Sequence, residues 1–117
     1  MTQNPGGIQV VVRPGAALSR SALRELFVAA WPRAGGPQFD LERSLCWASA
    51  HAGERLVGFV NVVGDGGVHA FVLDTTVHPD FRRQGIGLEL VRCAADEARE
   101  LGAEWLHVDY EPEHTVF

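Results

Sequence analysis

One stretch of the chain decides the fold: Leu73-Asp74-Thr75-Thr76-Val77-His78-Pro79-Asp80-Phe81-Arg82-Arg83-Gln84-Gly85-Ile86-Gly87-Leu88. Its first half is rich in β-branched residues and reaches a proline at 79, which predicts a strand that stops there. Its second half passes through Gly85 and Gly87 into a segment of helical periodicity. The first N–H groups of a helix have no intrahelical partner and lie at the positive end of its dipole. We therefore expect this loop to bind an anion.

The predicted helix runs from Gly85 to Leu101, and Gly102 ends it. Its expected buried side holds Leu88, Val91, Ala94, Ala95, Ala98 and Leu101. A last strand follows at residues 104–109. A helix between two strands predicts a crossover that joins parallel neighbours, which we expect near the centre of the sheet.

The residues before position 73 predict one more helix and a set of antiparallel strands. Strands are expected at 8–13, 45–51, 56–63 and 68–78, the last three as a meander. A helix capped by Ser19 or Ser21 runs to Trp31, with Leu23, Leu26, Phe27 and Ala30 on one face, and Asp40 caps a short helical turn. The fold class is therefore α+β: a mixed, mostly antiparallel sheet flanked by helices, in a single domain of residues 1–117.

The composition of the chain excludes several classes of function. The chain has 117 residues, 46% of them hydrophobic, and a net charge of −5, so we expect no nucleic-acid partner. It has no apolar run long enough for a membrane helix and no secretory signal, which predicts a cytoplasmic protein. Cys46 and Cys93 are too few for a disulfide framework or a four-cysteine zinc site, and the histidines lack ligand spacing, so no metal is expected.

The sequence of the glycine loop does not match either of two common nucleotide-binding motifs. A dinucleotide fingerprint needs a third glycine where this chain has Leu90, and a P-loop needs a lysine, which the chain lacks. An ordinary strand-to-helix turn, with glycines for close packing, remains open on the glycines alone.

The wider stretch resembles the coenzyme A-binding motif of the GNAT acetyltransferase superfamily, Arg/Gln-x-x-Gly-x-Gly/Ala after a strand ending in Val-x-Pro. Val77, Pro79, Arg82, Gly85 and Gly87 occupy those positions. The resemblance implies acetyl-coenzyme A as co-substrate. Its expected contacts are Thr75, Thr76, Val77, Arg82, Arg83, Gln84, Gly85, Ile86, Gly87 and Leu88.

The resemblance also implies where each part of that ligand lies. Backbone amides of residues 83–88 would hold the pyrophosphate, and the pantetheine arm would pair with residues 75–77 like an added strand. The sheet would splay between this strand and residues 104–109. A main-chain N–H near Val77 would then polarise the thioester carbonyl.

Direct transfer needs a group that takes a proton from the attacking amine. Asp74 is the preferred base or water holder, since its apolar neighbours would partly desolvate it; the alternative is a carboxylate that only orients its neighbours. His107 is a weaker candidate on the facing strand. Asp109 and Glu111 are candidates for binding a cationic amine, and Trp47 for shaping the substrate pocket.

The sequence departs from the family pattern after Phe117, where relatives continue with a helix and two strands. The family's usual tyrosine, which protonates the departing thiolate, has no counterpart here. We expect a shortened domain whose open edge at residues 105–108 is covered in a homodimer. The predicted function is acetyl transfer to a primary amine of a small molecule or peptide. The alternative is a non-catalytic module that binds acyl-coenzyme A or a protein partner.

Overall fold

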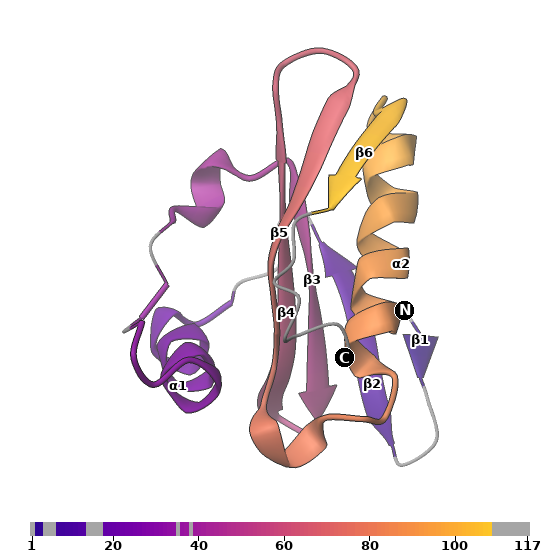
Figure 1. Cartoon of the computed structure of the whole chain (residues 1–117). Coiled ribbons are helices and arrows are strands. Elements are labelled where there is room, and N and C mark those ends of the chain that lie inside the picture. Colours follow the sequence, from indigo (N-terminus) through magenta and orange to yellow (C-terminus); the bar gives the residue numbers. More distant parts are fainter. Residues whose placement is uncertain (1, 4–6, 14–17, 35, 38, 109–117) are drawn as a thin grey trace.

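The computed structural model describes residues 2–3, 7–13, 18–34, 36–37 and 39–108. Six strands form one sheet in sequence order (Figure 1). They are β1 (Thr2–Gln3), β2 (Ile8–Arg13), β3 (Cys46–Ala52), β4 (Arg55–Gly64), β5 (His69–Val77) and β6 (Trp105–Val108). Neighbours are antiparallel except β5 and β6, which are parallel. The predicted α+β fold is confirmed; only the short β1 was not expected.

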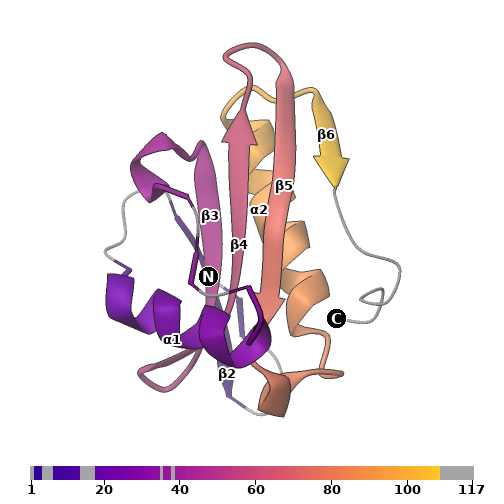
Figure 2. The ribbon, with the colours of Figure 1, turned by 60° about the vertical axis from the view of Figure 1, so that its left-hand side comes forward.

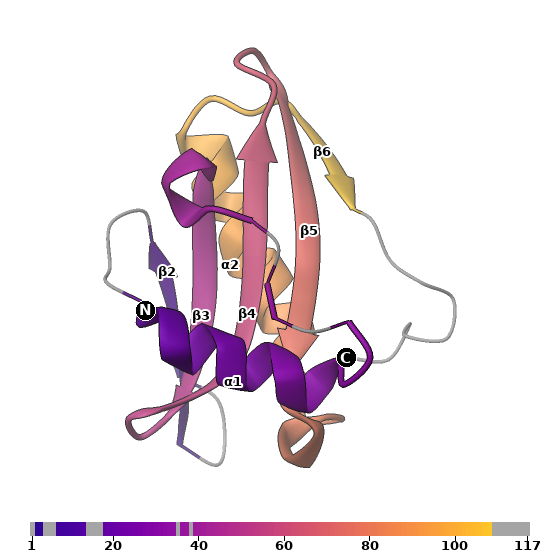
Figure 3. The ribbon, with the colours of Figure 1, turned by 90° about the vertical axis from the view of Figure 1, so that its left-hand side faces the viewer.

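Two helices cover opposite faces of the sheet, α1 (Arg20–Ala30) and α2 (Ile86–Glu100). Figures 2 and 3 show α1 in front of the strands and α2 behind them. The sheet has a hydrophobic core on each face, and each helix covers one of these cores with its apolar side. No helix among the described residues is long and apolar enough to cross a membrane.

The sequence signals for α1 and for the turn after it are confirmed. Ser19 caps α1, its hydroxyl accepting a hydrogen bond of 3.3 Å from the amide of Ala22. The buried residues of α1 are the expected four, Leu23, Leu26, Phe27 and Ala30. Asp40 caps the 3-10 turn η1 (Leu41–Arg43) by accepting from the amide of Glu42 at 3.0 Å.

The buried face predicted for α2 is partly wrong. Leu88 and Leu101 are 67% and 45% exposed, whereas a row at four-residue spacing is buried. That row is Ile86, Leu90, Ala94 and Ala98. It lies against β4 at Gly58, where an added Cβ would stand 2.9 Å from Leu90 Cδ1. The close approach that this glycine allows is a tertiary contact, so the helix's own pattern does not show it.

The crossover from β5 through α2 to β6 is present, but its position differs from the prediction. β6 pairs only with β5 and lies at the edge of the described sheet, not near its centre. The four pairs run from His69↔Trp105 to Val72↔Val108. Residues 73–77 of β5 continue beyond the last pair, and β6 leans away from β5 (Figures 2 and 3). Among the described residues, pairing of the two strands thus ends at Val72.

Candidate active site

The N-terminus of α2 has the geometry of an anion site. Gly85 precedes the helix in a left-handed conformation (φ 79°), and no side chain caps the helix there. The first helical bond runs from the amide of Glu89 to the carbonyl of Gly85, at 3.1 Å. The amides of residues 86–88 precede that bond, so they can donate to an oxyanion at the positive end of the dipole.

The sharp turn of the loop before α2 comes from two residues with positive φ. Arg83 also has a positive φ of 65°, so two residues of three adopt the left-handed conformation that turns backbone amides toward one side. A Cβ added at Gly85 would meet no protein atom within 4 Å. Glycine is therefore required here by its φ, and the space in front of it is open. Gly87 differs, since it is buried within the first turn of α2.

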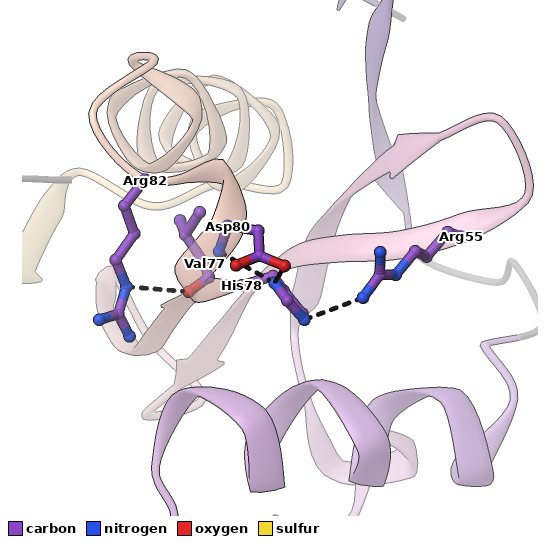
Figure 4. A network of polar contacts seen from close by, with 5 residues as sticks. All are labelled: Arg55, Val77, His78, Asp80 and Arg82. Carbon is purple, nitrogen blue, oxygen red and sulfur yellow. Dashed lines mark hydrogen bonds and ion pairs between the residues drawn. The ribbon is translucent and has the colours of Figure 1, made fainter.

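Arg82 ties this loop to two other elements. Its Nε donates to the carbonyl of Val77 at 3.2 Å, at the end of β5 (Figure 4). Its Nη2 donates to the carbonyl of Ala30 at 3.4 Å. A guanidinium at the last carbonyls of α1 also complements that helix's dipole. Arg82 thus ties the loop to the end of β5 and to the end of α1.

A second set of polar contacts shapes the other side of the β5 end. The ring of His78 caps the 3-10 turn η2 (Pro79–Phe81), with Nδ1 accepting from the amide of Asp80 at 3.1 Å. Nη2 of Arg55 lies 3.0 Å from Nε2 of the same ring. Arg55 and Arg82 approach the end of β5 from its two sides (Figure 4). These contacts hold the segment between β5 and α2 in place.

A β-bulge places Asp74 where β5 leaves β6. Phe59 pairs with Thr76 and Asn61 with Leu73, so two residues of β5 face Val60 of β4. Asp74 occupies the bulge with φ 58° and is exposed. The expectation that apolar neighbours would desolvate Asp74 is therefore wrong. The bulge breaks the alternation of the strand and turns the side chain out of the sheet core.

The residues after the bulge form a rigid free end of β5. Thr76 is 1% exposed; its hydroxyl donates to the carbonyl of Asp74 at 2.8 Å and accepts from Nε1 of Trp31 at 3.1 Å. Val77 packs in the core under α2, and Thr75 is half-buried. Their backbone pairs with β4 on one side, and the pairs described between β5 and β6 end at Val72↔Val108.

The other residues that the sequence suggested for the site are His107, Trp47, Asp109 and Glu111. His107 is exposed and stacks on Phe71, as described below. Trp47 lies in the core under α1, and its buried Nε1 is the one buried side-chain N or O atom of the described residues without a hydrogen-bond partner. Asp109 and Glu111 lie outside the described residues, and the homodimer and cytoplasmic location stay predictions.

The two cysteines differ in burial and in hydrogen bonding. Cys46 is fully buried, and burial raises the pKa of its thiol to about 11, with the charge of Glu97 adding to the effect. The Cys93 thiol donates to Oε1 of Glu89 at 3.6 Å. Within the described part of the chain, no three His, Cys, Asp or Glu side chains are grouped to hold a metal ion.

Sequence reasoning missed two residues of this region. Gly58 sets how closely α2 approaches the sheet, and His69 contacts His107 from the neighbouring strand. The pairing of β5 with β6 brings together histidines 38 positions apart. Only a correct strand register would have revealed either contact.

Comparison with known proteins agrees with this geometry. A model of the acetyltransferase (GNAT) family matches residues 17–115. An uncharacterized N-acetyltransferase, ycf52, of Pyropia yezoensis is 29% identical over 66 residues, which are 56% of this chain; the chain spans 38% of that relative's length.

Two solved structures illustrate the likeness in fold. The GNAT family acetyltransferase SP0256 of Streptococcus pneumoniae TIGR4 is 28% identical, with a TM-score of 0.71 over 90% of this chain and 76% of its own. An aminoglycoside acetyltransferase, meta-AAC0020 from an uncultured soil metagenomic sample, was solved with sisomicin. It is 18% identical, with a TM-score of 0.68 over 92% of this chain and 80% of its own. Since the family model covers most of the sequence, the chain belongs to the acetyltransferase (GNAT) family.

Proposed function

We propose that the chain transfers an acetyl group from acetyl-coenzyme A to a primary amine by direct attack. One observation carries the proposal: the uncapped N-terminus of α2 directly follows the free end of β5. A thioester with a diphosphate at its far end needs both features, an anion site and an unpaired strand edge beside it. Family membership supports acyl transfer as the reaction.

In this proposal the loop and the first turn of α2 hold the pyrophosphate. The amides of residues 83–88 donate to its oxygens, and Arg82 and Arg83 supply positive charge. The pantetheine arm lies along residues 75–77, which β6 leaves free. The thioester then lies near the bulge at Asp74, where the strands diverge.

The chemistry at the bulge follows from that placement. A main-chain N–H near Val77 donates to the thioester oxygen, stabilising the negative charge that develops as the amine attacks. Asp74, exposed at the bulge, holds the amine or a water that relays its proton. The acceptor is a small molecule or a peptide with a free amine. Acetyl transfer requires both substrates at once, because the amine attacks the bound thioester directly.

A charge placed at the α2 N-terminus tests the cofactor site without disturbing the core. Leu88 is 67% exposed in the first turn of α2. Leu88→Glu adds a carboxylate that suits a helix N-terminus but repels a diphosphate. Like charges 4 Å apart near a protein surface interact by about 4 kcal/mol, so we expect acetyl-coenzyme A binding to weaken by about tenfold or more even after screening by salt. Leu101→Glu, the same change at the other end of α2, is the control.

The assay incubates each protein with acetyl-coenzyme A and an aminoglycoside, spermidine, an amino acid and a short peptide, and measures the acetylated amine by mass spectrometry. We expect turnover of at least one acceptor by wild type and by Leu101→Glu, and loss in Leu88→Glu. Unchanged cofactor binding in Leu88→Glu would place the cofactor elsewhere. Binding without turnover of any amine would favour the alternative, a non-catalytic acyl-coenzyme A module.

A further inference from the structure

A half-buried histidine of β5, His69, meets an exposed histidine of β6, His107. Nδ1 of His69 lies 2.9 Å from Nε2 of His107, and the rings are nearly parallel, with centroids 5.1 Å apart. Trp105 stacks on the outer side of His69, and Phe71 stacks on His107 at 4.7 Å. The hydrogen bond and the stacking together fix the orientation of both imidazoles.

The pair lies on the face of the sheet opposite α2. Ala70 and Val72 are buried under α2, so the alternate residues His69 and Phe71 point to the opposite face. His107 lies on that face because its ring stacks on Phe71. α2 covers the other face; on the face of the histidines, α1 crosses near the far ends of the strands, and η1 with the segment before it also lies in front of the sheet (Figure 3). The histidines therefore stand on the face that α2 does not cover.

The pair also lies next to the point where β5 and β6 diverge. Their last pair is Val72↔Val108, one residue beyond His107. The bulge at Asp74 follows two residues after Val72. A thioester placed along residues 73–77 of β5 would thus lie just beyond the last described β5–β6 pair, close to His107.

The imidazole is the side chain whose reference pKa, about 6.5, is nearest to neutral pH. A general base is most effective when its pKa lies near the working pH. The carboxylate of Asp65, in the turn before β5, lies near His69: the pKa of Asp65 is lowered mainly by the backbone N–H of Gly67 and to a lesser degree by the charge of His69.

We propose that His107 accepts the proton of the attacking amine and that His69 positions the His107 ring and shares the proton. This inference rests on the proposed acetyl transfer. As the nitrogen lone pair forms the C–N bond, one N–H proton passes to His107. The C–S bond then breaks with its electron pair on sulfur, which leaves as the thiolate. The proton is shared along the bond to His69 and lost to water, so the pair returns to neutral.

The test compares His107→Gln and His69→Gln with His51→Gln, a matched change of a histidine bonded to Ser49 on β3. For an amine acetylated by wild type, we expect His107→Gln to lower kcat/KM by about 10²–10⁴-fold with acetyl-coenzyme A affinity kept. The loss should ease at high pH, where free amine is abundant. His69→Gln should lose less and shift the midpoint of the pH profile, and His51→Gln should behave as wild type.

A second readout needs no acceptor. Nitrogen-15 NMR of the imidazoles should show that the two rings share a hydrogen bond, so that His69→Gln changes the ring nitrogen signals of His107 and His107→Gln changes those of His69. Ring signals of each histidine that are unchanged by the other substitution would overturn the pair. Turnover that survives in His107→Gln with an unchanged pH profile would overturn the inference while leaving acetyl transfer intact. A wild type that acetylates no amine would overturn both.

Discussion

Gly58 of β4 sets the distance between α2 and the sheet, so Gly58→Ala should displace the helix at whose N-terminus we propose the cofactor site. A Cβ at this position would lie 2.9 Å from Leu90 Cδ1, 3.1 Å from Ala50 Cβ and 3.2 Å from Ile86 Cγ2. Leu90 and Ile86 are fully buried, and the Cβ of Ala50 cannot rotate away. The added methyl group can be accommodated only if α2 or a strand moves.

The size of the effect follows from two opposing terms. Overpacking of this kind costs about 1–3 kcal/mol. Replacing glycine with alanine also stabilises the folded state by about 0.4–1 kcal/mol, because it lowers the conformational entropy of the unfolded chain. We therefore expect a net loss of about 1–2 kcal/mol in the free energy of unfolding. For a chain of 117 residues this lowers Tm by about 4–8 °C.

The assay is thermal and urea unfolding of Gly58→Ala beside Gly64→Ala in the same strand. A Cβ at Gly64 would have only ordinary contacts, the nearest at 3.7 Å, so its variant should lie within about 0.5 kcal/mol of wild type. Acetyl-coenzyme A should also bind Gly58→Ala more weakly, because the first turn of α2 moves. If both glycine variants were equally stable, Gly58 would not set the position of α2.

Two further predictions concern groups whose pKa is shifted by full or partial burial. In a Cys93→Ser background, Cys46 should not react with a thiol reagent at pH 8 until the protein unfolds, because it is buried and its pKa is raised to about 11; rapid labelling of the native protein would contradict this. Burial lowers the pKa of His51 below 6.5, so the unfolded chain binds that proton more readily and stability should fall as pH drops below about 6.5. His51→Gln should reduce that slope in urea unfolding between pH 7 and 5, and an unchanged slope would exclude His51 as a cause.

The fold was predictable because its signals are local. The strands alternate or are β-branched, Ser19 and Asp40 cap their helices, and the stretch from Asp74 to Gly87 marks the turn from strand to helix. The buried face of α2 was not predictable, since it depends on which row of side chains along the helix packs against Gly58. Leu88 and Leu101 have the hydrophobicity of core residues but lie outside that contact.

The candidate site divides in the same way. The left-handed Gly85 and the open helix N-terminus follow from residue types next to one another in sequence. The exposure of Asp74 does not, because a bulge is a property of how two strands pair. The contact of His69 with His107 depends on the register of a parallel pair that residues 78–104 separate. Chemistry built across strands therefore requires the structure.

The central claim is that acetyl-coenzyme A binds with its diphosphate at the α2 N-terminus and its arm along the free end of β5. The most direct measurement is a titration of the nitrogen-15-labelled protein with acetyl-coenzyme A, followed by its backbone amide signals. The account predicts that the largest shifts occur at residues 83–88 and 75–77 and that they disappear in Leu88→Glu. Largest shifts at other residues, or no shifts with saturating ligand, would contradict it.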